Sequence, residues 1–236
     1  MFYEEYAPKS FLFDYLECYW GIQGFVRKEE TEITSIFPDG CVDIIINLGD
    51  PMYRLGVAKN LLPSKYVVGA MSKPIAVELT GKVKIVGMRF KPGGAYPFLE
   101  TPIKKLTDKT IDLFSVSEIL AEKLASDRLS ECLHNLAFSV LENSVAECVS
   151  NSLNIDEIIK EAVSVIRVNE GNMPISNLVR YLDCNKRTLE REFLKYVGLT
   201  SKFFSRVTRV QNAIKIIRGI TKTEYVSMAY DLGYFD

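Results

Sequence analysis

The stretch ISNLVRYLDCNKRTLEREFLKYVG, residues 175–198, decides the C-terminal fold. Its first part places apolar side chains three or four residues apart, the spacing of one helix face. The triplet DCN at 183–185 interrupts this pattern, and Asn185 is a favourable N-cap for a second helix. We expect Gly198 to end that second helix. Its buried stripe should consist of Leu189, Phe193 and Val197.

The other faces of the second helix carry charged side chains, mostly basic ones. Two helices joined by a three-residue turn, with a basic second helix, are typical of a helix-turn-helix motif. A helix of this kind fits the major groove of B-DNA. An ordinary solvated helix would show the same charges, so the surrounding sequence has to distinguish a DNA-binding helix from a solvated one.

The chain of 236 residues has a net charge of −1, but its charges are unevenly distributed. Residues 169–222 hold eleven Lys and Arg against four Asp and Glu, a net charge of +7, which leaves −8 for the remainder. A basic segment on an acidic body is expected of a protein that binds a polyanion.

The segment is similar to the first helix-turn-helix motif of the AraC family of transcriptional regulators. That family has apolar residues before the turn, then a fixed Asn/Ser, Leu, Arg, Phe and Gly, and then a long connecting helix. The matching positions are Ile175, Leu178, Val179, Leu182, Asn185, Leu189, Arg191, Phe193, Gly198, Ser201, Phe204, Arg209 and Ala213. Leu194 in place of Lys and Val179 in place of Ala depart from the pattern without altering the buried faces.

The resemblance implies a double-stranded DNA partner, RNA polymerase as a second partner, and specific contacts on the second helix. By position in the motif, the expected base-reading side chains are Lys186, Arg187, Glu190 and Arg191. Arginine reads guanine with two hydrogen bonds, and glutamate accepts from cytosine. The expected phosphate contacts are Lys195, Lys202, Arg206 and Lys215, which would otherwise be solvated surface. Arg191 has the alternative of pairing with an acid of its own domain, and Arg209 is expected to be structural.

YVSMAYDLGYFD, residues 225–236, resembles the opening of the family's second helix-turn-helix motif. The second recognition helix would begin about where this sequence stops. We therefore expect an incomplete DNA-binding domain over 152–236, either a fragment or a natural early stop. Such a chain should bind DNA weakly and with strong salt dependence.

The first part of the chain has the rhythm of an all-β domain. From residue 18 to about 100, short Val- and Ile-rich runs alternate with Gly and Pro breaks, and Asp39-Gly40 is a turn signal. This predicts a sandwich or barrel over 1–110. FPDGCVDIIINL and VGMRFKPGGAYPFL resemble a poorly characterised sensor domain fused to AraC-type DNA-binding domains. That resemblance implies a cupin-like or jelly-roll fold and names no ligand.

A small effector bound in this β-rich domain would make the protein ligand-responsive. Candidate lining residues are Trp20, Asp39, Asp43, Arg89 and Tyr96. All but Tyr96 have a structural alternative. Trp20 could belong to the core and Asp39 could form the turn, while Asp43 could lie at an edge. Arg89, inside an apolar run, could point outward or pair inward.

A helical segment over 111–151 separates the two parts. Apolar residues from Leu129 to Val145 recur every three or four positions, and Ile119, Leu120 and Leu124 indicate a shorter helix before them. The stripe could pair two chains into a homodimer, or it could pack onto the β domain of its own chain. The expected fold is therefore α+β: a β domain, a helical linker and an incomplete all-α DNA-binding domain.

Composition restricts the remaining possibilities. The five cysteines lack C-x-x-C spacing and the one histidine is His134, so we expect no disulfide framework, metal site or cofactor. No apolar run approaches the length of a membrane span, and the N-terminus is acidic where a secretory signal would be basic, which favours a cytoplasmic protein. The alternatives to a regulator are a cupin-like enzyme and a protein-interaction fragment that dimerises without binding DNA.

Overall fold

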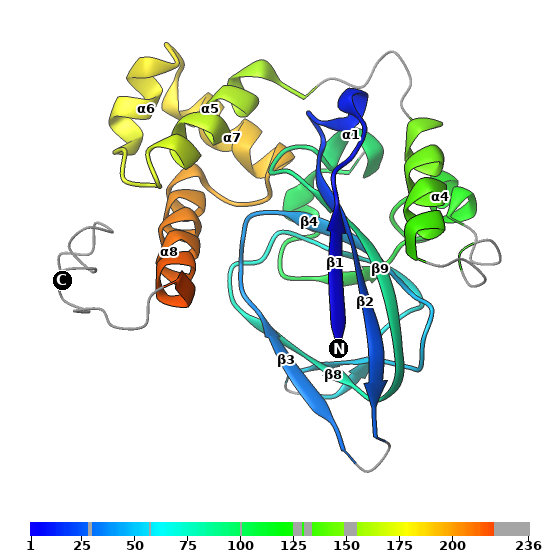
Figure 1. Cartoon of the computed structure of the whole chain (residues 1–236). Coiled ribbons are helices and arrows are strands. Elements are labelled where there is room, and N and C mark those ends of the chain that lie inside the picture. Colours follow the sequence, from blue (N-terminus) through cyan, green and yellow to red (C-terminus); the bar gives the residue numbers. More distant parts are fainter. Residues whose placement is uncertain are drawn as a thin grey trace.

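The computed structural model describes residues 1–27, 30–56, 58–99, 101–124, 129, 134–148 and 155–219. Strands occupy the first part of the chain and helices the rest, an α+β arrangement (Figure 1). The expected second motif at 225–236 and the connecting residues 151–154 lie outside the described residues.

The larger of two sheets has six antiparallel strands in the order β1-β2-β9-β4-β7-β10. Their bounds are β1 Phe2–Tyr6, β2 Leu16–Val26, β9 Gly81–Phe90, β4 Val42–Asn47, β7 Lys65–Val68 and β10 Thr110–Asp112. The edge strand β1 lies before the region in which the sequence pattern indicates strands. Its FYEEY segment has no Val or Ile, which is why the pattern does not reveal it.

The smaller sheet has four antiparallel strands in the order β3-β8-β5-β6. Their bounds are β3 Glu32–Ile36, β8 Ile75–Leu79, β5 Tyr53–Leu55 and β6 Asn60–Leu61. Apolar side chains of both sheets form one buried cluster, which includes Trp20, Ile45, Tyr66, Ile75 and Ile85. The predicted β domain is thus present, with its two sheets sharing a core.

Strand β4 explains why the run VDIII is almost continuously apolar. Ile44 and Ile46 belong to the cluster beneath the helices, whereas Ile45 belongs to the cluster between the sheets. A strand that is covered on both faces needs apolar side chains on both. Asp43 shares the inner face of Ile45 and is 9% exposed, so its carboxylate requires partners.

Short helices follow the strands on the covered face of the large sheet. Their bounds are η1 Ser10–Leu12, α1 Tyr96–Leu99, η2 Ile103–Lys105, α2 Glu118–Lys123 and α4 His134–Ala146. Ser117 caps α2 by accepting from the amide of Leu120. The side chain of His134 lies outside the described residues, and Ile119 is exposed whereas Leu120 and Leu124 are buried.

Helix α4 packs on β2 and β9 of its own chain. Its side chains Ala137, Phe138, Leu141 and Val145 are buried, and the ring of Phe138 lies 4.4 Å from that of Tyr6, centroid to centroid. The described part of the apolar stripe therefore packs on the β domain of its own chain, one of the two possibilities that the sequence leaves open. Dimerisation through this segment stays a prediction.

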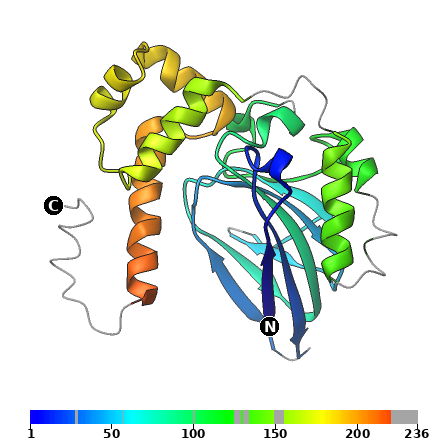
Figure 2. The ribbon, with the colours of Figure 1, turned by 45° about the horizontal axis from the view of Figure 1, so that its top comes forward.

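The C-terminal helices are α5 Glu157–Val168, α6 Ile175–Tyr181, α7 Lys186–Tyr196 and α8 Ser201–Gly219. Figures 1 and 2 show α8 and α4 on opposite sides of the sheets. As predicted, Asn185 caps α7 by accepting from the amide of Arg187 at 2.8 Å. Gly198 ends α7 with φ +84°, a conformation in which a Cβ is unfavourable.

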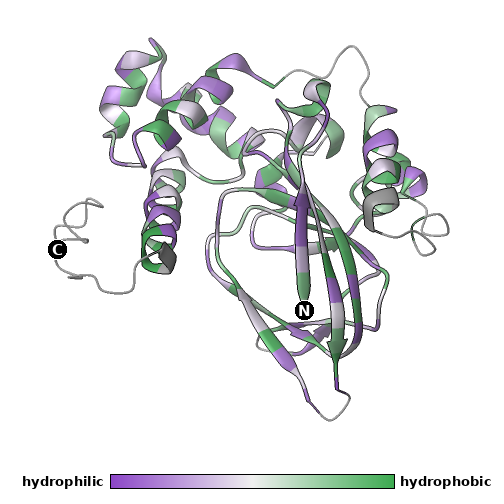
Figure 3. Cartoon of the chain, in the orientation of Figure 1, coloured by the Kyte–Doolittle hydropathy of each residue, from purple (hydrophilic) through white to green (hydrophobic). Residues whose placement is uncertain are grey.

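The C-terminal helices share a hydrophobic core with the β domain. One buried cluster runs from Ile44 and Phe90 in the sheet, through Ile103, to Phe193 and Phe204 in α7 and α8. Figure 3 shows green, hydrophobic stretches on the strands and alternating purple and green on the C-terminal helices. This alternation is expected of helices that are buried on one face and solvated on the other.

Candidate nucleic-acid interface and interdomain cleft

The predicted apolar stripe of α7, Leu189, Phe193 and Val197, is buried. Helix α7 packs on α5, α6 and α8. The rings of Phe193 and Phe204 lie 5.8 Å apart. Leu178 of α6 is completely buried in the same cluster. One side of α7 is thus fixed, and its orientation relative to α6 is set by packing rather than by the turn alone.

The N-terminal half of α7 is accessible. Lys186 and Arg187 are exposed, and within the described part of the chain neither side chain has a polar partner. Arg191 is also exposed, with 71% of its side chain accessible, and its Nε donates to Glu192 at 2.8 Å. Exposed pairs of this kind contribute about 0–1 kcal/mol. Arg191 thus pairs with an acid of its own domain, the alternative that its sequence position left open. Because the pair is weak, Arg191 can exchange Glu192 for another partner.

Glu190, expected to read bases, has a different role in the structure. Its Oε1 accepts from the hydroxyl of Ser201 at 2.5 Å and its Oε2 from the amide of Ser201 at 3.3 Å. Both carboxylate oxygens thus hold the first residue of α8, and a negative charge is favourable at a helix N-terminus. Glu190 therefore caps α8 in this structure, and to reach a base it would have to leave a fully buried serine unpaired. Its base-reading role stays an untested prediction.

The predicted phosphate contacts fall into two groups. Lys202 and Arg206 lie exposed on α8, the latter with its guanidinium 5.7 Å from the Phe203 ring centroid. The Nζ of Lys195 instead lies 4.9 Å from the Tyr96 ring centroid and 4.8 Å from that of Tyr196. Lys195 therefore lies at the contact between α7 and the β domain, where a phosphate would have to displace aromatic partners.

The predicted effector residues do not form one pocket. Trp20 is 7% exposed in the core between the sheets, and its Nε1 donates to Asp43 Oδ1 at 2.9 Å. Tyr96 lies on α1, with its ring 4.6 Å from that of Tyr196 of α7. Trp20 is therefore a core residue and Tyr96 an interface residue. For Trp20 this is the structural alternative that the sequence left open, whereas Tyr96 packs on a ring of α7.

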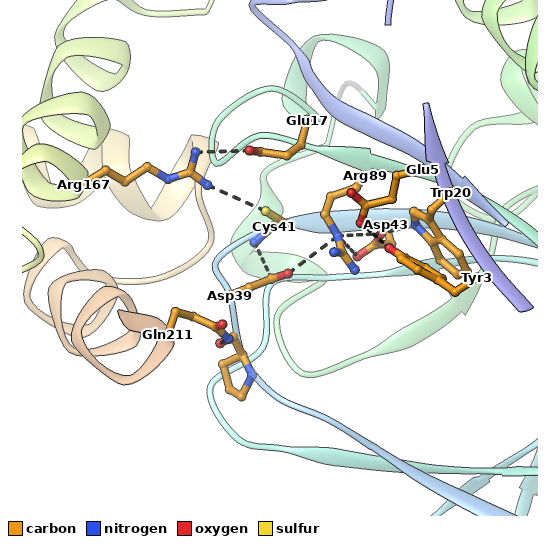
Figure 4. Close-up of polar contacts among 11 residues, drawn as sticks. Tyr3, Glu5, Glu17, Trp20, Asp39, Cys41, Asp43, Arg89, Arg167 and Gln211 are labelled. Atoms are coloured by element: carbon orange, nitrogen blue, oxygen red, sulfur yellow. Dashed lines mark hydrogen bonds and ion pairs between the residues drawn. The ribbon is translucent and has the colours of Figure 1, made fainter. Parts of the chain in front are cut away.

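Asp43 and Arg89 form a buried ion pair on neighbouring strands. The Nε of Arg89 donates to Asp43 Oδ1 at 3.2 Å and lies 3.6 Å from Asp39 Oδ2. Beside this cluster the hydroxyl of Tyr3 donates to Glu5 (Figure 4). Burial raises the pKa of Asp43 to about 6, against the opposing attraction of the Arg89 guanidinium. Arg89 points inward and is paired, one of its two predicted alternatives.

The loop 38–41 connects this ion pair to the C-terminal helices. Asp39 Oδ1 accepts from the amide of Cys41 at 2.9 Å, and Pro38 O accepts from the side-chain amide of Gln211 on α8 (Figure 4). Gly40 adopts φ +81°, and a Cβ there would lie 2.4 Å from the ring of Phe204. The Asp39-Gly40 turn joins β3 to β4, which belong to different sheets, so it is an interdomain contact and not the turn of a hairpin.

A cleft of about 330 Å³ lies where this loop meets α5 and α8. We call it the interdomain cleft. Its lining consists of Glu17, Asp39, Cys41, Arg89, Arg167, Thr208, Gln211, Asn212 and Lys215. Of the predicted effector residues, only Asp39 and Arg89 line it. The remaining lining residues come from β2, from Cys41 in the loop 38–41, and from α5 and α8, so no local motif in the sequence could bring them together.

The described cysteines are free thiols, and the described residues offer no metal-binding cluster. Cys18 and Cys41 are buried free cysteines, while Cys148 and Cys184 are partly accessible. Burial raises the pKa of the Cys41 thiol well above its usual range. Within the described ranges no group of three or more His, Cys, Asp or Glu side chains could hold a metal ion. Nor does any described helix combine the length and apolarity needed to cross a membrane.

Comparison with known proteins gives one family match and distant structural likenesses. The profile of a domain of unknown function, DUF6597, matches residues 4–112, less than half of the chain. No curated protein matches the sequence.

Two solved structures illustrate the structural likenesses. ToxT from Vibrio cholerae O395 is 9% identical with a TM-score of 0.45, over 92% of this chain and 88% of that one. The AraC-like transcriptional activator CuxR is 9% identical with a TM-score of 0.34, over 89% and 86% of the two chains. At this level of similarity, neither the fold nor the function of those proteins transfers to this chain.

Proposed function

We propose that the chain is a sequence-specific DNA-binding transcription regulator in which α6 and α7 form a helix-turn-helix. The observation that carries this proposal is the division of α7 into a buried face and an accessible basic N-terminal half. Lys186 and Arg187 are exposed there without polar partners among the described residues. Recognition helices use their N-terminal residues to contact base edges, so these two side chains are correctly placed for that role.

The contacts divide by chemistry. Arg187 is proposed to donate two hydrogen bonds to a guanine, with Lys186 and Arg191 as further base-reading side chains. Lys202 and Arg206, exposed on α8, are proposed phosphate contacts that fix the position of the helix pair. Glu190 is left out of this set because of its contact with Ser201.

The β domain is proposed to control this helix pair in response to a small effector. It contacts the C-terminal end of α7: the hydroxyl of Thr107 donates to Gly198 O at 2.7 Å, and Tyr96 packs on Tyr196. A change in the β domain would therefore shift α7 directly. The family resemblance adds RNA polymerase and a second copy of the chain as partners, and a cytoplasmic location.

Selection from random DNA duplexes tests the proposal without knowledge of an operator. Duplexes retained by the immobilised chain should become enriched in a short sequence motif. Arg187→Ala should lose discrimination at one or two positions of that motif, at a cost of about 1–3 kcal/mol in binding free energy. The matched variant Lys202→Ala should weaken binding evenly across sequences and lower the salt slope by about 1.

The same selection separates the alternatives. An even pool after repeated rounds, at low as well as moderate salt, would refute sequence-specific binding and favour the interaction-fragment alternative. Enrichment that survives Arg187→Ala unchanged would leave the function standing and remove Arg187 from the reading set.

A further inference from the structure

The interdomain cleft has walls from both halves of the protein. Asp39 and Arg89 come from the β domain, Arg167 from α5, and Asn212 and Lys215 from α8 (Figure 4 shows the first three). Its volume of about 330 Å³ is at the lower end of the range of small-molecule sites. A molecule held there would touch the ion pair of the β domain and the helix that follows the proposed recognition helix.

The lining of the cleft selects for a polar ligand. Among the described residues, its lining side chains are charged, amide, hydroxyl or thiol groups, with no aliphatic or aromatic side chain. An alkyl chain placed there would leave donors and acceptors of the lining without partners, which is unfavourable. The ligand class is therefore a small hydrophilic metabolite rather than a fatty acid.

One side of the cleft favours an anion. Three cations, Arg89, Arg167 and Lys215, stand against the carboxylates of Glu17 and Asp39 in the lining and of Asp43 beside Arg89, so that the two signs balance overall. Arg89 is already shared between Asp39 and the buried Asp43. The excess positive charge therefore lies on the side of the cleft formed by α5 and α8.

Three side chains on that side, Arg167, Asn212 and Lys215, have donors available to a ligand. The Nη1 of Arg167 pairs with Glu17 Oε2 at 3.1 Å, but its Nη2 meets only the sulfur of Cys41 at 4.0 Å, and a thiol is a weak acceptor. Asn212 and Lys215 have no polar side-chain partner within the part of the chain that the structure describes. A carboxylate or phosphate could bind Arg167 and Lys215 without breaking an existing ion pair.

We propose that the interdomain cleft binds a small hydrophilic metabolite through one carboxylate or phosphate group, held by Arg167 and Lys215 and hydrogen-bonded by Asn212. The regulatory part of this inference rests on the proposed function. A bound anion would link α5 and α8 to the loop 38–41 and so hold the C-terminal helices against the β domain.

Calorimetric titration of the full chain, in phosphate-free buffer of low ionic strength, tests the ligand class. The probes are glycerol 3-phosphate, succinate and octanoate, which separate a phosphate source from a carboxylate source and from an apolar acid. We expect saturable binding of glycerol 3-phosphate or succinate, at least tenfold tighter than that of octanoate. Binding of neither polar anion, or tightest binding of octanoate, overturns the proposal.

Variants locate the site. Lys215→Gln should weaken the polar anion about tenfold, because it removes one charge-assisted hydrogen bond. Arg167→Lys, which keeps the charge but loses the second donor, should weaken it several-fold. Lys73→Gln, at an exposed lysine of the β domain outside the cleft, is the matched control and should leave affinity unchanged. Equal losses for both lysine variants would show general charge attraction and refute the site.

These titrations contain no DNA, so their outcome is independent of the duplex selection. If a duplex motif is enriched while the anions fail to bind, the cleft proposal falls and the DNA-binding function stands. If the anions bind as predicted and no motif is enriched, the cleft remains a binding site and the regulator function falls.

Discussion

Removal of the Glu190 carboxylate should destabilise the junction between α7 and α8. In Glu190→Ala the amide and hydroxyl of Ser201 both lose their acceptor, and Ser201 is completely buried, so water does not replace it. Hydrogen bonds to a charged acceptor contribute about 1.5–3 kcal/mol, and an abandoned buried donor costs about 1–3 kcal/mol. We expect a loss of about 2–3 kcal/mol in the free energy of unfolding. Glu190→Gln keeps one acceptor oxygen and should lose about 1 kcal/mol.

Urea unfolding followed by circular dichroism measures the effect. With a typical m-value the Glu190→Ala midpoint should fall by on the order of 1 M. Glu161→Ala on α5 is the matched control, since Glu161 accepts one surface hydrogen bond from Tyr181 and its removal should change stability by less than about 0.5 kcal/mol. A Glu190→Ala midpoint equal to that of the native chain would refute the capping role. A changed duplex motif for Glu190→Gln would restore the base-reading role.

Three further variants test the buried ion pair and the docking of the C-terminal helices. Burial raises the pKa of Asp43 to about 6, against about 3.9 in an unfolded chain, so the folded protein holds this proton more tightly. The tighter binding of this proton contributes fully to stability below about pH 4, and the contribution is lost as pH rises through 6. When the pH is lowered from 7 to 5, the free energy of unfolding should therefore rise by about 1.3 kcal/mol relative to that of Asp43→Asn. A flat difference across that range, in unfolding at several pH values, would contradict this. Thr107→Val removes the hydrogen bond to Gly198 O and should cost about 1 kcal/mol, with faster amide exchange in α7; unchanged exchange would show that the contact contributes nothing. Gly198→Ala forces a side chain into φ +84°, with its Cβ 2.8 Å from Ile103 Cγ2, and should cost about 1–3 kcal/mol; a melting temperature equal to that of the native chain would argue against the tight approach.

The helices of the C-terminal part could be predicted because their signals are local. Asn185 caps α7 and Leu189 and Phe193 form its buried stripe, both as the spacing indicates. The β-rich character of the first part was likewise readable from Val and Ile runs and from the Asp39-Gly40 turn. Strand β1 was not, since nothing in its composition favours a strand except its aromatic residues.

Roles that depend on tertiary contacts could not be predicted. Glu190 lies on a basic helix at a position that the motif assigns to base contact, and only the approach of Ser201 gives it another partner. Trp20 and Tyr96 look alike as candidate ligand-binding aromatics, yet one is in the core and the other at a domain contact. Arg167 has no distinguishing sequence feature, because its neighbours Glu17 and Cys41 are more than a hundred residues away.

The hydrophobic cluster that spans the sheet and the C-terminal helices limits how this protein can be recombined. Chimeras that exchange such helices between proteins assume that the C-terminal helices and the β domain fold independently of each other. Here, C-terminal helices from another protein would not match the surface around Ile103 and Gly40, and apolar side chains that are now covered would be exposed to water. A functional hybrid would have to carry the matching surface of the β domain with it.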